Sequence, residues 1–473
     1  MKLIFTGHND RYAIEQDLLA FFPNERPVYD PDAAEDSCAW VKLSEGATYT
    51  TATTRIRYQG REGRGLSRVR IDPALTAYQQ EGLRQRALKM SFFKASVEIL
   101  GRVPAWGSLT GVRPAKLAAR LLRSGMTPRQ ADRELANTYQ VSAPRRRMCI
   151  EAAQAGIAAK EGLAPNDISL YIGIPFCPTR CAYCSFVSQA VERSFKLMEP
   201  YLEALEREIT LAAQMDHLLT HLNRSFDLSG VVEYCIEAGR PDTIEREKLQ
   251  VLLDHGADRI SVNPQSLDDR VLQAIGRRHT AADILAAMEL ATSMGFPHVN
   301  MDLIAGLPAD TPEGFRNTLD QCVKSGADNI TVHTLALKKG SRLTLEGSPI
   351  PSAEAVAEML DYADPTLRAA GFAPYYLYRQ KYMSGSFENV GWCISGAEGL
   401  YNIYIMEELH SILSLGAGGS TKMVDIRRDD RIDRIFHPKY PTEYIQRQEQ
   451  LAADLEKFAA FHREMLENPY KKD

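Results

Sequence analysis

The pattern of hydrophobic and polar residues divides the chain into three parts. In the first, a short apolar run at Lys2–Thr6 predicts a strand, and residues 36–75 mix apolar and turn residues as β structure does. From Leu83 to about Glu161, apolar residues recur every three or four positions, which predicts helices. We therefore expect an N-terminal α+β domain over residues 1–165, with a role that the pattern does not reveal.

Strands and helices alternate in the second part, over residues 166–345. Apolar runs predict strands at Ser169–Ile174, Val231–Glu237, Arg259–Val262, His298–Ala305 and Asn329–Leu335. Helical periodicity predicts helices at Glu199–Met215, Glu245–His255, Asp269–Ile275, Ala281–Met294 and Glu313–Ser325. Such alternation is typical of parallel βαβ units, in an open sheet or in a barrel.

The third part, residues 346–473, is expected to form a C-terminal domain or extension. Apolar periodicity predicts a long helix from Ser352 to Ala370. Past Gly371 the sequence is rich in aromatic residues, and we expect an irregular segment there. The tail, Glu443–Glu467, predicts a charged helix.

Composition argues against several classes of partner. The formal net charge is −5 and the pI is near 6.1, so electrostatics give no reason to expect nucleic acid or an anionic membrane. No apolar run reaches ~18 residues, so we expect no membrane span. The opening residues, MKLIFTGHNDRYAIEQ, lack the apolar length and cleavage site of a signal peptide, and we expect a cytoplasmic protein.

Three of the eight cysteines are grouped on one loop. Cys177, Cys181 and Cys184 have the spacing C-x3-C-x2-C directly after a predicted strand. Without a secretory signal, such a group indicates metal binding or redox chemistry rather than a disulfide framework. Three thiolates suit an iron–sulfur cluster and leave one iron of a cubane open to a small molecule. A zinc site or an incidental cysteine-rich turn is the alternative, but no second cysteine or histidine pair has a matching spacing.

This loop resembles that of the radical S-adenosylmethionine (SAM) superfamily, which has the same spacing with an aromatic residue before the third cysteine. The opening Gly173-Ile-Pro-Phe-Cys177 is similar to that of the oxygen-independent coproporphyrinogen III dehydrogenase family and its haem-chaperone relatives. The segment Leu109-Thr-Gly-Val-Arg-Pro114 resembles the longer, HemZ-type subgroup. The resemblance covers roughly residues 168–425. It implies an α/β fold, the radical SAM partial (β/α)6-type barrel, with an N-terminal α+β domain and a C-terminal helical extension.

The resemblance also implies the cofactors, a [4Fe–4S] cluster on the three cysteines and SAM at its open iron. The segments E-A-G-R-P, N-P-Q-S, G-R-R-H and N-M-D-L-I-A-G-L-P follow the family's order. By this mapping, the residues implied to lie at SAM are Tyr171, Tyr183, Glu237, Gln265, Arg277, Asp302 and Ala336. Taken singly, each is more often a cap, turn or surface residue. However, Glu237 and Asp302 fall in the C-terminal ends of predicted strands, where parallel α/β folds bind ligands.

Two features depart from the family pattern. The family carries a G-G-G-T-P segment between the cluster loop and the strand that ends at Glu237, whereas here residues 216–223 continue a helical pattern. Either the barrel is one strand short through a natural loss, or the sequence carries an assembly or deletion artefact. The family's oxidative enzymes have a fourth cysteine two positions after the third; here that position holds Phe186, as in the haem-chaperone relatives.

The resemblance implies an oxidoreductase of haem biosynthesis, which converts coproporphyrinogen III to protoporphyrinogen IX by oxygen-independent oxidative decarboxylation. The implied partners are a small-molecule tetrapyrrole and a reducing donor of flavodoxin or ferredoxin type. The aromatic block Tyr375–Tyr382, with Trp392 and Cys393, would line a macrocycle pocket or form a domain core. The alternatives are a haem-binding or haem-chaperone relative without dehydrogenase activity and a catalytically impaired member without the glycine-rich SAM segment.

Overall fold

The structure is a computed structural model. It describes residues 1–22, 25–30, 32, 35–184, 186, 188–209, 228–338, 341–380, 383–426 and 431–467. The chain forms two compact units, Met1–Ile150 with Arg379–Phe387, and Glu151–Tyr378 with Glu388–Asp473. The predicted domain boundaries at residues 165 and 345 stay a prediction.

A four-stranded sheet packed on two helices forms the first unit. In spatial order its strands are β1 (Lys2–Thr6), β2 (Cys38–Glu45), β3 (Tyr49–Tyr58) and β4 (Arg61–Arg70), with β1 parallel to β2 and the other neighbours antiparallel. The helices of this unit are α1 (Arg11–Phe21), α2 (Ala77–Leu100), α3 (Pro114–Arg123), α4 (Pro128–Tyr139) and the first half of α5 (Ala143–Glu161). The predicted α+β character is confirmed.

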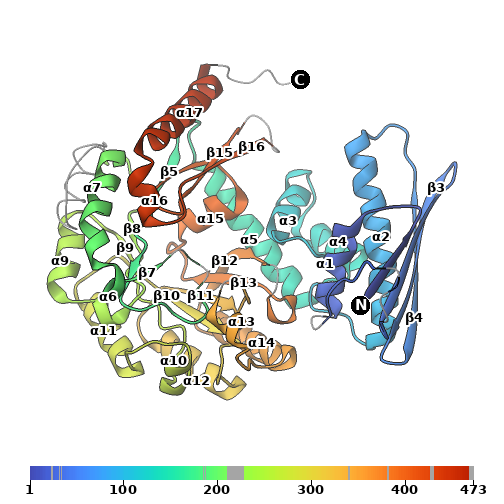
Figure 1. Ribbon diagram of the computed structural model, residues 1–473, viewed down its shortest axis with the longest axis horizontal. Coiled ribbons are helices and arrows are strands. Elements are labelled where there is room, and N and C mark those ends of the chain that lie inside the picture. Colours follow the sequence, from blue (N-terminus) through green and yellow to red (C-terminus); the bar gives the residue numbers. More distant parts are fainter. Residues whose placement is uncertain are drawn as a thin grey trace. The chain divides into compact units, whose positions relative to one another are not determined.

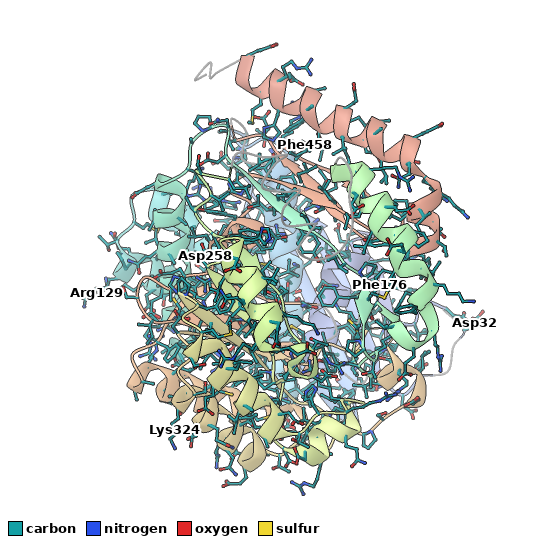
Figure 2. The ribbon with its side chains drawn as sticks, turned by 90° about the vertical axis from the view of Figure 1, so that its left-hand side faces the viewer. Asp32, Arg129, Phe176, Asp258, Lys324 and Phe458 are labelled. Carbon is teal, nitrogen blue, oxygen red and sulfur yellow. The ribbon has the colours of Figure 1, made fainter. Side chains whose placement is uncertain are left out.

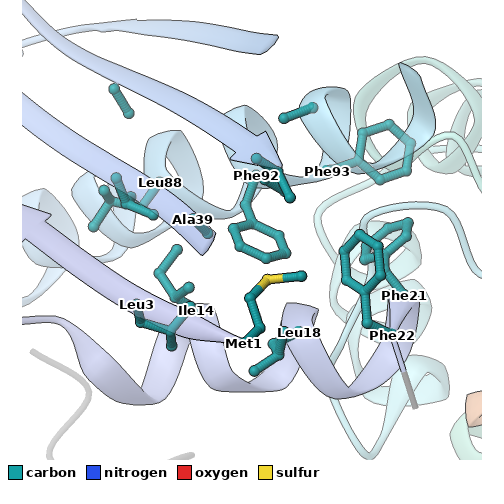
Figure 3. Close-up of a cluster of buried hydrophobic side chains, with 14 of the residues drawn as sticks. Met1, Leu3, Ile14, Leu18, Phe21, Phe22, Ala39, Leu88, Phe92 and Phe93 are labelled. Carbon is teal, nitrogen blue, oxygen red and sulfur yellow. The ribbon is translucent and has the colours of Figure 1, made fainter. Parts of the chain in front are cut away.

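Apolar side chains from the sheet, α1 and α2 make the core of this unit (Figure 3). Phe22, which follows α1, meets Phe92 of α2 edge-on with ring centroids 6.5 Å apart, and Leu18 of α1 belongs to the same buried cluster. The helix α2 lies close on β4 because Gly65 has no side chain; a Cβ there would come within 1.8 Å of the Ser91 carbonyl oxygen. Glycine is thus required at this contact.

A six-stranded sheet with helices on its outer side forms the centre of the second unit (Figure 1). In spatial order its strands are β12 (Ala373–Tyr378), β13 (Asn389–Cys393), β11 (Asn329–Thr334), β10 (His298–Ala305), β9 (Arg259–Ser261) and β8 (Cys235–Ile236). The outer helices are α9 (Arg246–Asp254), α10 (Asp269–Ala274), α11 (Ala281–Ser293), α12 (Pro312–Lys324) and α14 (Ala353–Ala369). Strands β8 to β11 are parallel, which confirms the predicted βαβ units.

The strand predicted at Val231–Glu237 is mostly wrong, because only Cys235–Ile236 pairs with β9. Val231 and Val232 are 44% and 72% exposed, so their apolar pattern reflects no buried strand. The predicted helix residues beyond Ile209, and the place where the family's G-G-G-T-P segment would lie, fall outside the described residues.

A second sheet joins the strand before the cluster loop to the C-terminal part. Its strands, in spatial order, are β16 (Ile432–Phe436), β15 (Ser420–Val424), β14 (Ser411–Leu415) and β5 (Ile168–Ile172), and β5 is parallel to β14. The irregular segment predicted past Gly371 is therefore wrong: it holds five strands and the helix α15 (Leu400–Glu407). Strands such as β13, buried at all five positions, show no alternation that the sequence could reveal.

The remaining elements are short or lie at the end of the chain. They are β6 (Phe176–Cys177), β7 (Gln189–Ala190), α6 (Val191–Ser194), η1 (Phe195–Leu197), α7 (Met198–Ile209), η2 (Pro241–Thr243), α13 (Arg342–Glu346), η3 (Ser384–Ser386), α16 (Pro441–Gln446) and α17 (Gln448–Glu467). The tail thus contains two helices in place of the single predicted one, separated at Arg447. In the described part of the chain, no helix has the length and apolarity needed to cross a membrane.

Candidate cluster and SAM site

The three grouped cysteines lie on the loop that leaves β5. Cys177 ends the short strand β6, and Cys181 and Cys184 lie in the turns that follow. All three thiols are free and half-buried. The backbone N–H of Ala182 donates to the Ile275 carbonyl over 2.9 Å, which ties the loop to the end of α10.

Tyr201 of α7 supports the start of this loop. Its ring meets Phe176, labelled in Figure 2, edge-on at 5.3 Å between centroids. Its hydroxyl donates to the Gly173 carbonyl over 2.6 Å and accepts from the Ala417 N–H over 2.9 Å. The glycine-rich turn at residues 416–419 is thus held to the segment that leads into the cysteine loop.

The chemistry of the three free thiols is that of iron–sulfur cluster ligands. Among the described residues, no three His, Cys, Asp or Glu side chains come close enough to hold a single metal ion. A zinc site needs its ligands around one ion. In a cubane each thiolate binds its own iron, so three free thiols spread along one loop meet its requirement.

Two buried arginines lie beside Cys181. Arg277, which follows α10, donates from Nη2 to the Tyr183 hydroxyl over 3.3 Å and from Nη1 to the Asn263 carbonyl over 2.6 Å. Arg240, which follows β8, brings Nη1 to 4.0 Å from the Cys181 Sγ. Burial raises the pKa of the Cys177 thiol, and the positive charges of Arg240 and Arg277 oppose that rise. The two arginines therefore reduce, but do not reverse, the cost that burial places on the thiolate form of Cys177.

The predicted carboxylates meet at the carboxyl edge of the parallel strands. Asn263 Nδ2 donates to Glu237 Oε2 over 3.4 Å, and Asn263 Oδ1 accepts from the Asp302 N–H over 3.2 Å. Because Arg277 donates to the carbonyl of the same asparagine and to the Tyr183 hydroxyl, Asn263 links the Glu237 carboxylate and the Asp302 backbone to the cysteine loop. A cationic or hydroxyl-bearing ligand would find acceptors here.

The two carboxyl groups differ in their proton affinity. Glu237 keeps an accessible side chain, yet surrounding protein atoms remove much of its water, and this, with the negative charge of Asp302, raises its pKa to about 7. Burial acts to raise the pKa of Asp302 too, but interactions with His333, Asn300 and Thr331 outweigh it and hold that pKa below its ordinary value. Near neutral pH the pair therefore carries between one and two negative charges.

Gln265 shapes the same edge through its backbone. It has a φ of 66°, its N–H donates to the Asp302 carbonyl over 2.9 Å, and its carbonyl accepts from the Ile304 N–H over 3.0 Å. Gln265 as a whole is buried, with 7% of its surface exposed. A left-handed conformation outside glycine is uncommon and is held here by two hydrogen bonds to β10.

The other predicted residues lie around this group. Tyr171 on β5 is 40% exposed and stacks on Tyr401 of α15, with ring centroids 6.1 Å apart. Burial raises the pKa of Tyr183, whose hydroxyl accepts from Arg277 and stays neutral. Ala336 lies two residues past β11 in a half-buried segment.

Sequence reasoning missed four residues of the site, Arg240, Asn263, His333 and Tyr401. Arg240 and Asn263 stand inside the E-A-G-R-P and N-P-Q-S segments, so their position was a signal that could have found them. His333 and Tyr401 have no such signal. In the aromatic block, Tyr375, Tyr376 and Cys393 pack in one buried cluster, which favours the domain-core alternative, and Tyr382 lies outside the described residues.

Comparison with known proteins identifies the family. The model of the radical SAM superfamily matches residues 171–322. The "oxygen-independent coproporphyrinogen-III oxidase-like protein HemZ" of Bacillus subtilis is 37% identical over 378 residues, which cover 73% of this chain and 75% of that protein. "Heme chaperone HemW" of Bacillus subtilis is 29% identical over 239 residues, 44% of this chain and 62% of HemW, a little less than two thirds of its length.

Among solved structures, the chain is similar to "Coproporphyrinogen III oxidase (HemN) from Escherichia coli is a Radical SAM enzyme", with a TM-score of 0.50. The sequences are 23% identical, and the match covers 63% of this chain and 72% of that one, so the likeness concerns the fold alone. The α/β radical SAM fold implied by the sequence resemblance is confirmed. The chain belongs to the radical SAM superfamily, within the family of oxygen-independent coproporphyrinogen-III oxidase-like proteins.

Proposed function

We propose that this protein holds a [4Fe–4S] cluster on Cys177, Cys181 and Cys184 and binds SAM at the iron that the three thiolates leave open. The observation that carries the proposal is the loop of three free, half-buried thiols, which Arg277 and Asn263 link to the Glu237 carboxylate and to the backbone of Asp302. When bound, the two groups would supply one-electron reduction and hydrogen-atom abstraction, while the protein orients them and excludes water.

The residues of the strand edge have distinct roles in this proposal. Asp302, with its lowered pKa, accepts from the ribose hydroxyls of SAM, and Glu237 accepts from the SAM ammonium when it is ionised. Gln265 keeps the backbone beside Asp302 in place through its two hydrogen bonds to β10. Tyr171, Tyr183, Arg277 and Ala336 are the other residues that we assign to the SAM site.

For the reaction, we propose the oxidative decarboxylation of coproporphyrinogen III. Hydrogen abstraction from a propionate side chain, loss of carbon dioxide and transfer of one electron to an acceptor leave a vinyl group, and two rounds give protoporphyrinogen IX. The names of the HemZ and HemN relatives support this substrate class. A reduced flavodoxin- or ferredoxin-like protein would supply the reducing electron.

Anaerobic reconstitution tests both parts of the proposal. Wild-type protein should hold ~4 iron and ~4 sulfide per chain, and should form protoporphyrinogen IX from coproporphyrinogen III with SAM and a reductant. Cys181→Ser should lose iron and activity. Cys38→Ser, a buried thiol of the first unit, is the matched control and should keep both. A cluster-loaded wild type that cleaves SAM but makes no product would remove the decarboxylation and leave the cofactor assignment standing.

A haem-binding function is the second candidate because of one position. Phe186 stands where the family's oxidative enzymes have a fourth cysteine, and its residue is 77% exposed. An exposed aromatic ring beside the cluster loop offers an apolar contact for a macrocycle. Titration with haemin should then produce a Soret band that Phe186→Ser weakens, without SAM cleavage. Absence of any spectral change would discard this candidate.

A further inference from the structure

Arg240 and Arg277 approach the same cysteine from different segments. Arg240 Nη1 lies 4.0 Å from the Cys181 Sγ. Arg277 also interacts with this sulfur, and it is bound to the Tyr183 hydroxyl two positions further along the loop. Both residues are at most 8% exposed, so their charges act through protein rather than through water.

A network of hydrogen bonds fixes the Arg240 guanidinium at this sulfur. Its Nε and Nη2 donate to the two oxygens of Asp242 over 2.9 and 2.8 Å. Its Nη1 donates to the Thr179 carbonyl over 3.1 Å and to the Thr179 hydroxyl over 3.0 Å. A bidentate pair holds a guanidinium in one orientation. The group therefore presents a fixed N–H to the cysteine loop.

His279 joins the two arginines without adding charge. Its Nδ1 lies 3.2 Å from Asp242 Oδ1, and its Nε2 lies 3.5 Å from Arg277 Nη1. Because an arginine can only donate, Nε2 accepts and Nδ1 donates. Burial and the charge of Arg277 lower the pKa of His279, so the ring is neutral. Two arginines and one aspartate leave this network with one net positive charge beside Cys181.

We propose that Arg240 is a positioning residue that holds its positive charge beside the Cys181 sulfur and raises the reduction potential of the cluster. Reduction adds negative charge to the cluster and its thiolates, and a fixed cation 4.0 Å from a sulfur stabilises that charge. The inference rests on the cluster part of the proposed function and is independent of the tetrapyrrole substrate. A purely structural clamp, through Thr179 alone, is the competing account.

Potentiometric titration of the reconstituted cluster, followed by electron paramagnetic resonance without SAM or substrate, separates the two accounts. Arg240→Gln removes the cation and should shift the reduced-to-oxidised ratio at a fixed potential about tenfold toward the oxidised form, about 59 mV for one electron. Asp242→Asn leaves the Arg240 charge less neutralised and should shift the ratio in the opposite direction. Shifts of the potential in opposite directions in the two variants are expected if charge is the cause, and are not expected if both substitutions only loosen the loop.

Arg278→Gln is the matched control, because Arg278 neighbours Arg277 but is 68% exposed and pairs with Glu192 at the surface. Its potential should equal that of the wild type. Equal potentials in all variants, or a shift of the same sign in both network variants, would overturn the proposal. If Arg240→Gln retains no iron, the Asp242→Asn variant alone decides. A reduction potential of its cluster that equals or lies below that of the wild type then rejects the inference. A wild type that holds the cluster but makes no product would count against the decarboxylation only.

Discussion

Asp302 on β10 and His333 on β11 face each other across neighbouring parallel strands, with Asp302 Oδ2 3.7 Å from His333 Nε2. Their side chains are 22% and 25% exposed, at the edge where the strands end. The separation is that of an ion pair rather than a direct hydrogen bond. Burial acts to raise the pKa of Asp302, but His333 leads the interactions that lower it. This carboxylate therefore stays ionised near neutral pH, where Glu237, with a pKa of about 7, is only partly ionised.

His333→Gln should weaken the binding of SAM about fivefold, because a partly exposed pair contributes on the order of 1 kcal/mol. Isothermal titration of the cluster-loaded protein measures the change. The chain offers a matched control in His298, which pairs with Asp328 at 2.6 Å at the opposite end of the same two strands. His298→Gln should bind SAM as the wild type does. Equal affinities in the two variants would contradict a role for His333 at this edge.

The binding of SAM should strengthen as pH rises through the pKa of Glu237, which burial and the charge of Asp302 raise to about 7. Protonated below that pKa, Glu237 offers no charge to an ammonium. Affinities measured roughly one unit below and one unit above it should differ about tenfold. Glu237→Gln should abolish this dependence, and a variant that keeps the wild-type slope would assign the titration to another group.

The raised pKa of Glu237 affects stability and SAM binding in opposite ways as pH rises: SAM binding strengthens, whereas the protein becomes less stable. Since the folded-state pKa of Glu237 exceeds its ordinary value, the folded protein binds the proton more tightly than the unfolded chain does. This group's contribution to the free energy of unfolding is therefore present at low pH and is lost as pH rises from the ordinary value to about 7. Urea denaturation at several pH values should show a shallower fall for Glu237→Gln across that window.

The sequence predicted the site where local pattern and position coincide. The strand that carries Asp302, His298–Ala305, was predicted from its sequence, and the carboxyl end of such a strand is where parallel sheets bind ligands. The cysteine spacing is local as well. His333 escaped notice because it belongs to the site only through the register that sets Ile304 beside it on β10, and register between strands far apart in sequence leaves no local trace.

The C-terminal strands were missed for a related reason. β14 pairs with β5, which sets Ser411 against Ile168 across more than half of the chain. Pairing between strands so far apart in the sequence leaves no signal in the periodicity of hydrophobic residues or in the turn residues. In β13 the sequence pattern is weaker still, because one of its five positions is Gly391, which has no apolar side chain. Glycine is needed there because a Cβ would lie 1.9 Å from a ring carbon of Tyr376 on the paired strand.

Glu208→Ala should destabilise the second unit by about 3 kcal/mol, since it leaves buried donors without their acceptor, at roughly 1–3 kcal/mol each. Glu208 lies 3.4 Å from His437 Nδ1, and both side chains are at most 2% exposed. It also accepts from the Gly416 N–H over 2.8 Å and from the Tyr444 hydroxyl. The free energy of unfolding in urea measures the loss. Glu203→Ala on the same helix, 59% exposed, should change stability by no more than about 0.5 kcal/mol.

Two glycines of the first unit should respond to alanine in opposite directions. Gly65→Ala would drive a Cβ to 1.8 Å from the Ser91 carbonyl oxygen, so α2 must move off β4 and the unit should lose several kcal/mol of stability, of the order of ~3. Gly82 lies within α2 with no atom within 4 Å of the added Cβ, and Gly82→Ala should add about 0.5–1 kcal/mol through helix propensity. Thermal unfolding followed by circular dichroism compares the two. A Gly65→Ala protein as stable as the wild type would mean that α2 does not lie against β4 as closely as this contact requires.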